Sequence, residues 1–218
     1  MDLSLVETMV RAGACREFED RDVPDDLLVE LFSSARFAPS GGNRQPTRFV
    51  VIRDSEVKHK LGQLYLSVWE PYYEGVKSGE IGADVKPSAV ESADRFARSF
   101  HEVPVMLMVC ADPSVIQMTD LELDRPSLVG GASIYPFVQN LILLCRQAGL
   151  GASITTLLCG HEGPIKEILD IPDEYAVVGT VVLGWPARPL PTKLKRLTVP
   201  ELVFSERFGN PIGTNGKD

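Results

Sequence analysis

Three short runs of almost entirely apolar residues constrain the fold of this chain more than any other feature. They lie at residues 49–52, 103–110 and 177–183. A strand with one face in water alternates apolar and polar residues, whereas a strand covered on both faces is apolar throughout. The longer runs are at most half the length of a membrane span. They therefore predict a layered core, in which a sheet carries helices on both faces.

Helix signals lie around these runs. Ser4 and Glu7 have capping-box spacing, which predicts a first helix over about residues 5–11. A second helix is expected between Pro24 and Pro39, because the leucines there repeat at helical spacing. Further helices are predicted within residues 56–100, 134–148 and 164–169.

Glycines and prolines predict where these helices end. The stretch 56–100 is expected to break into at least two helices around an exposed excursion, at Pro71, Gly75, Gly79, Gly82 and Pro87. Gly149 is expected to stop the long helix. Gly149-Leu150-Gly151 is therefore interpreted as a helix stop, not as a dinucleotide fingerprint, which opens a helix after a strand. No internal repeat is apparent.

Charge and composition exclude several classes of function. With 22 basic and 30 acidic residues the net charge is −8, and an acidic surface repels the nucleic-acid backbone, so no nucleic acid is expected as a partner. No membrane segment and no basic region typical of a signal peptide are visible, which predicts a cytoplasmic protein. The four cysteines show no CxxC spacing and are expected in the core, and the three histidines have no metal-ligand spacing.

The loop at residues 38–46 carries the most informative chemistry. Gly41 and Gly42 allow positive φ and a close approach of the backbone to a ligand. Ser40, Asn43 and Gln45 supply hydrogen-bond donors and acceptors, and carboxamides suit the edge of a heterocycle. The residues by themselves fit either a connecting loop or a site for a planar, polar ligand.

The order of several motifs adds a resemblance to this reading. Arg16-Glu17-Phe18, Val23-Pro24, ARFAPSGGNRQP and GGASIYPFVQNLILLCRQAGLGASITTL follow one another along the chain, with similar segments at 167–172 and 181–186. Over about residues 6–203 the chain resembles the FMN-dependent nitroreductase family. The resemblance implies an α+β, three-layer fold with a central mixed sheet flanked by helices. It also implies one domain over residues 1–218, with a helical excursion at about 56–100 and an extended dimerisation tail from about 186.

The resemblance also implies a function. Members of the family bind FMN at a homodimer interface, take a hydride from NADH or NADPH and reduce an electron-poor acceptor such as a nitroaromatic or a quinone in a ping-pong sequence. The flavin carries the electrons, so no side chain is predicted as a catalytic acid or base. Two alternatives stay open: a flavin reductase of the same fold with dehalogenating or ene-type activity, and a flavin-binding protein without turnover.

Site residues carry over from the family by position. Arg16 corresponds to a phosphate ligand, with Lys195 and Arg196 as candidates from the tail, although a solvated charge run is an alternative for the tail residues. The family's turn near the N5 and O4 edge of the flavin corresponds to Thr155, Thr156 and Leu157. Its contacts to the flavin ring and ribityl chain correspond to Ser40, Gly41, Asn43 and Gln45.

The chain departs from the family at two places. Ala12, Gly13 and Ala14 stand where two basic residues and a serine are common, so some phosphate contacts are expected to be absent. Thr47 stands where a tryptophan is frequent.

Overall fold

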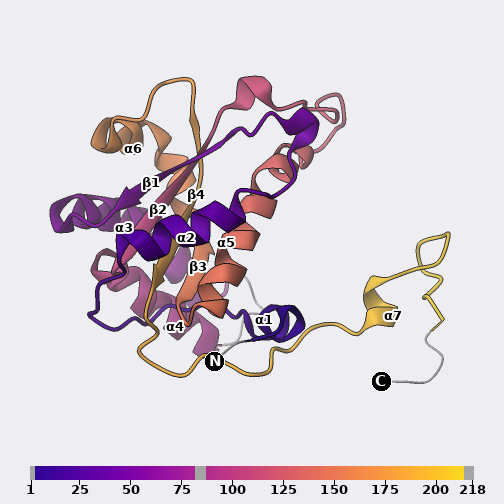
Figure 1. Cartoon of the computed structure of the whole chain (residues 1–218), viewed down its shortest axis with the longest axis horizontal. Coiled ribbons are helices and arrows are strands. Elements are labelled where there is room, and N and C mark those ends of the chain that lie inside the picture. The colour runs from indigo at the N-terminus through magenta and orange to yellow at the C-terminus, as the bar shows by residue number, and fades with distance from the viewer. Residues whose placement is uncertain (1–2, 82–86, 214–218) are drawn as a thin grey trace.

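A four-stranded sheet forms the centre of the computed structural model, which describes residues 3–81 and 87–213 (Figure 1). The strands are β1 (Thr47–Ile52), β2 (Val105–Ala111), β3 (Gly151–Thr155) and β4 (Ala176–Gly184), in the order β1-β2-β4-β3. Each neighbouring pair is antiparallel. The predicted α+β class is therefore confirmed, but the expectation of a mixed sheet is wrong for the described strands. A strand that is covered on both faces is apolar whether it runs parallel or antiparallel to its neighbours, so its apolar sequence does not reveal its direction.

Helices cover both faces of this sheet. The α-helices of the described residues are α1 (Leu5–Arg11), α2 (Asp25–Ala35), α3 (Ser55–Ser78), α4 (Pro87–Arg98), α5 (Tyr135–Gln147), α6 (Glu162–Leu169) and the short α7 (Val199–Leu202), which does not lie on the sheet. Leu107 and Val109 of β2 belong to one buried cluster, with residues of α2 and α5. Met106 and Met108 belong to the other, with residues of α3, α4 and α6. Every residue of β2 is buried, as a strand between two helical layers requires.

Local signals placed the first two helices and the central helix correctly. Ser4 and Glu7 form both halves of the capping box at the start of α1. The second helix lies between Pro24 and Pro39, as the leucine spacing predicts. At the end of α5, Gly149 has φ +85°, a conformation that glycine adopts without steric cost.

The excursion between β1 and β2 corrects the expected breaks. Pro71 and Gly75 lie inside α3, which continues to Gly79, where φ is +80°. The helix carries through because its buried face, including Tyr65 and Trp69, packs along the core and outweighs the local cost of proline. Of the other expected breaks, Pro87 begins α4 and Gly82 lies outside the described residues.

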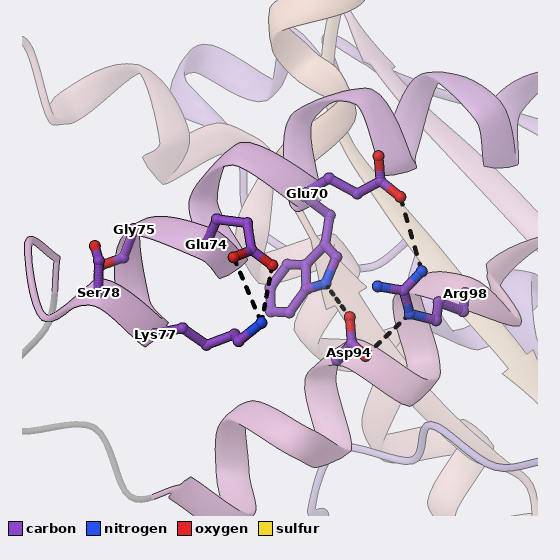
Figure 2. A network of polar contacts seen from close by, with 8 residues as sticks. Glu70, Glu74, Gly75, Lys77, Ser78, Asp94 and Arg98 are labelled. Atoms are coloured by element: carbon purple, nitrogen blue, oxygen red, sulfur yellow. Dashed lines mark hydrogen bonds and ion pairs between the residues drawn. The ribbon is translucent and has the colours of Figure 1, made fainter.

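Polar contacts fasten α4 to α3 (Figure 2). The Trp69 indole donates to Asp94 Oδ1 at 2.9 Å, and Arg98 Nε donates to Asp94 Oδ2 at 3.0 Å. Arg98 also lies 3.7 Å from the Glu70 carboxylate. Burial raises the pKa of Asp94, but the hydrogen bonds from Trp69 and Arg98 more than compensate and lower it. The excursion is thus two helices joined by a charged network.

Strand β3 is the element that sequence patterns missed. Its residues, Gly-Ala-Ser-Ile-Thr, were expected as the end of a helix and a turn, and they pair with β4 instead. The outer edge of β3 accepts a hydrogen bond at 3.0 Å from the Cys15 amide to the Ala152 carbonyl. This contact brings the segment before Arg16 beside the sheet.

The tail leaves the body of the protein after Pro186 and extends to α7, which lies apart from the other labelled helices (Figure 1). Its first part is anchored, because Pro191 and Leu194 lie so close to Gly13 that a Cβ there would meet Pro191 Cγ at 2.8 Å. Its last part exposes large apolar side chains, among them Leu202 at 57% and Phe208 at 96%. No helix in the described parts of the chain is both long and apolar enough to cross a membrane.

Candidate functional site

The loop before β1 has an unusual backbone. Gly42, Asn43 and Gln45 have φ values of +59°, +55° and +49°. Asparagine tolerates this region better than most residues, and glutamine adopts it rarely. Backbone strain of this kind gathers at ligand-binding segments and persists only where neighbouring contacts hold it.

Two serines hold the loop in this shape. Ser40 Oγ accepts a hydrogen bond from the Gln45 amide at 3.1 Å, and the Ser40 carbonyl accepts one from the Asn43 amide at 2.9 Å. Ser133, just before α5, accepts from the Gly41 amide at 3.0 Å. The sequence does not predict this role of Ser133, because no local pattern signals a contact across 92 positions.

The loop borders open space. A cavity of about 570 Å³ is lined by Ser40, Gly41 and Gly42 of the loop, and its other lining residues include Gln117 and Ser133. The Gln45 side-chain amide donates to Asn43 Oδ1 at 3.2 Å, and both residues are exposed. The loop therefore presents a shaped set of amide and hydroxyl groups to solvent, as a polar ligand edge requires.

The turn after β3 lies against α3. Thr155 ends the strand, Thr156 follows, and Leu157 begins a short 3₁₀ turn. Thr155 Oγ1 accepts from the Leu157 amide at 3.4 Å and lies 3.2 Å from the Tyr65 hydroxyl. Burial raises the pKa of Tyr65, while the hydrogen bond with Thr155 and the charge of Arg16 act to lower it. Arg16 thus lies within electrostatic reach of this turn.

Arg16 is exposed at the edge of the sheet, and it forms no ion pair within residues 3–81 and 87–213. Lys195 and Arg196 are exposed as well, a few residues after the contact between Leu194 and Gly13. The structure therefore brings the basic part of the tail close to the segment that carries Arg16. Guanidinium and ammonium groups without carboxylate partners suit a phosphate.

The loop and the turn stay apart within one chain. Thr155 pairs with Thr180 on β4, Thr180 with Met108 on β2, and Met108 with Val50 on β1. Three strand spacings separate the two edges, which is roughly 14 Å. Hydrogen bonds need donors and acceptors about 3 Å apart. The expected site residues therefore form two groups, one at each edge of the sheet.

These two groups fit the parts of FMN. The exposed cations at Arg16 and on the tail suit the phosphate, and the threonine turn and the carboxamide loop suit the heterocycle. The cysteines are less suited to chemistry, since burial raises the pKa of Cys110 to about 11 and also raises that of Cys159. Within the described ranges, no group of three or more His, Cys, Asp and Glu side chains is arranged to hold a metal ion.

Comparisons with known proteins show the family to which the chain belongs. The model of the nitroreductase family matches residues 12–185. A relative from Haliscomenobacter hydrossis, an iodotyrosine deiodinase, is 31% identical over 172 residues, which cover 79% of this chain and 74% of the relative.

Solved structures with this fold include two flavoproteins. An iodotyrosine deiodinase bound to FMN and 3-iodo-L-tyrosine superposes with a TM-score of 0.71 at 22% identity, covering 94% of this chain and 100% of the other. An FMN and NADPH-dependent nitroreductase from Sphigopyxis sp. strain HMH superposes with a TM-score of 0.67 at 20% identity, with the same coverage. At these identities the structures show the fold alone.

Proposed function

This chain belongs to the nitroreductase family, and from that premise we propose that it is an FMN-dependent oxidoreductase that uses NADH or NADPH to reduce an electron-poor acceptor such as a nitroaromatic or a quinone. FMN, when bound, supplies the electron transfer. The residues of the chain bind the cofactor, orient it and place dipoles where its charge changes.

The observation that carries this proposal is the loop at residues 38–46. Its strained backbone is held by Ser40 and Ser133, its Asn43 and Gln45 are exposed, and its residues 40–42 line a cavity. Positive φ at a glutamine is a strained conformation of the kind that gathers at ligand-binding segments. Pre-organised amides of this kind are what a flavin edge requires.

A second copy of the chain would complete the site. The loop and the turn lie at opposite edges of one sheet, so we propose that FMN binds at a homodimer interface, between the turn of one copy and the loop of the other. Large apolar side chains are exposed on two segments of the chain, helix α1 and the tail. They are Leu5, Val6, Met9 and Val10 on α1, and Leu197, Val199, Leu202 and Phe208 on the tail. A partner copy would bury them.

The proposed phosphate ligands are Arg16, Lys195 and Arg196. The contact between Leu194 and Gly13 supports this set, because Arg16 follows Gly13 closely in sequence and Lys195 and Arg196 follow Leu194. The backbone around Thr155, Thr156 and Leu157 would face the N5 and O4 edge of the flavin, where a fixed N–H dipole stabilises negative charge on the reduced ring.

An anaerobic absorption spectrum tests the proposal. The purified protein is supplemented with FMN, desalted and recorded before and after addition of NADH or NADPH. We expect retained flavin bands that bleach with a nicotinamide and return with a nitroaromatic or a quinone. Loss of all flavin on desalting would refute cofactor binding, and flavin that is retained but never bleached would support the non-catalytic alternative.

A second candidate is reductive dehalogenation. The deiodinase relative at 31% identity favours it. With the flavin pre-reduced, 3-iodo-L-tyrosine should then release iodide faster than a nitroaromatic is reduced. No release of iodide above the rate of free reduced FMN would exclude this candidate.

A further inference from the structure

The ring of Tyr65 is buried in the core, and its hydroxyl contacts Thr155 of the candidate site. Only 4% of the residue is exposed, and its ring stacks on Phe100 with centroids 4.1 Å apart and planes 13° apart. The hydroxyl lies 3.2 Å from Thr155 Oγ1, at the end of β3. The aromatic packing on α3 therefore fixes the position of one polar atom at the turn.

The two hydroxyl groups have one proton more than their mutual hydrogen bond uses. Tyr65 and Thr155 each carry one O–H, and a single bond between them consumes one proton. The Leu157 amide adds a second donor to Thr155 Oγ1 at 3.4 Å. Within the described residues neither hydroxyl donates to any other group. The pair thus offers one O–H to a ligand.

The chemistry of the two groups decides which O–H is free. A phenol is more acidic than an alkyl alcohol and is the stronger donor. Burial raises the pKa of Tyr65, and the nearby charge of Arg16 acts against that increase, so the phenol stays the more acidic of the two hydroxyl groups. Tyr65 therefore donates to Thr155, and the proton of Thr155 is left to point away from the pair.

We propose that Tyr65 is a positioning residue, whose hydroxyl turns the Thr155 O–H toward the edge of the bound flavin and strengthens it as a donor to the reduced ring. The inference rests on the proposed function, in which this turn faces the flavin. Hydrogen bonds in a chain polarise one another, so Tyr65 acts on the cofactor through Thr155 without touching it.

The midpoint potential of the bound FMN tests the proposal. Tyr65→Phe keeps the stacked ring and removes only the hydroxyl. We expect the preference for reduced over oxidised FMN to fall about fivefold, the size of one ordinary hydrogen bond. For a two-electron couple this lowers the potential by about 20 mV. The affinity for oxidised FMN, measured by quenching of its fluorescence, should change less than twofold.

Matched variants separate this role from packing. Tyr73→Phe makes the same change on the same helix, where the hydroxyl has no hydrogen-bond partner in the described parts of the chain, and should leave the potential unchanged. Thr155→Val should lower the potential at least as much as Tyr65→Phe, whereas Thr155→Ser should retain it. In the double variant, Tyr65→Phe should add nothing to Thr155→Val, because the two residues act in one chain.

The outcomes are distinct. A wild-type protein that retains no FMN overturns the proposed function and this inference together. FMN that is retained with an unchanged potential in Tyr65→Phe overturns the inference alone, as do equal shifts in the Tyr65 and Tyr73 variants. Circular dichroism checks folding, and if Tyr65→Phe fails to fold, an unchanged potential in Thr155→Val overturns the inference independently.

Discussion

The Gly41 amide donates a hydrogen bond of 3.0 Å to Ser133 Oγ, across 92 positions of sequence. One partner lies in the strained loop before β1 and the other just before α5. The short turn before α5 therefore helps to fix the position of the loop that carries the two carboxamides. A ligand held by the loop therefore depends on a serine that lies far from the loop in sequence.

Ser133→Ala should weaken FMN binding about fivefold, because one hydrogen bond that holds the loop contributes about 1 kcal/mol. Fluorescence titration of the protein with FMN measures the effect. Ser33→Ala is the matched control, since Ser33 Oγ donates to the Val29 carbonyl of its own helix and to no other group among the described residues. Equal affinity in the Ser133 and Ser33 variants would contradict a role of this contact in shaping the loop.

Arg16→Gln should lower the affinity for FMN about tenfold or more, as expected for loss of a hydrogen bond to a charged phosphate. Riboflavin has the same ring without the phosphate, so its binding should change little. Arg95→Gln removes an equal charge from the exposed surface of α4 and should leave both affinities unchanged. Equal losses for FMN and riboflavin in Arg16→Gln would show that Arg16 contacts the ring instead.

The layers of the fold could be predicted because strands that are buried on both faces consist of apolar residues. Strand β2 is apolar throughout because it is buried on both faces. Leu107 packs in the cluster with α2 and α5, and Met108 packs in the cluster with α3, α4 and α6. The apolar pattern does not distinguish a parallel from an antiparallel strand. Pro71 was expected to break a helix, yet burial of Trp69 beside it outweighs a local preference.

The site could be predicted only in its local parts. Positive φ at Gly42 is encoded by glycine itself, and the carboxamides stand in the same loop. Ser133 and Tyr65 escape such reasoning, because each acts on a partner about 90 positions away. Long-range contacts of this kind depend on how the layers pack, which single-sequence patterns do not specify.

Asp120→Asn should destabilise the loop between β2 and α5 at neutral pH. The Asp120 carboxylate is 5% exposed and accepts hydrogen bonds from Ser127 Oγ, the Leu128 amide and Arg125 Nη1. These donors, Ser127 foremost, hold its pKa well below the ordinary value. We expect a lower urea midpoint for the variant at pH 7.

The pH dependence follows from the direction of that shift. A carboxyl with a lowered pKa in the folded state stabilises the protein above its unfolded pKa, about 4, and loses this contribution as the pH falls below that value. The difference in urea midpoint between wild type and Asp120→Asn should therefore shrink from pH 7 to pH 3. Asp124→Asn, at an exposed position of the same loop, should show no difference at either pH. A constant difference would mean that packing, not charge, holds the loop.

Leu202→Asp should dissociate the proposed homodimer and release FMN in the same step. Leu202 lies on α7 with 57% of its surface exposed, and burial against a partner copy would take a carboxylate at this position out of water. Light scattering and a desalting test measure mass and retained flavin on one sample. We expect a dimer with flavin for wild type and for Leu202→Met, and a monomer without flavin for Leu202→Asp. A wild-type monomer that retains FMN would place both groups of site residues on one chain and would exclude the interface site.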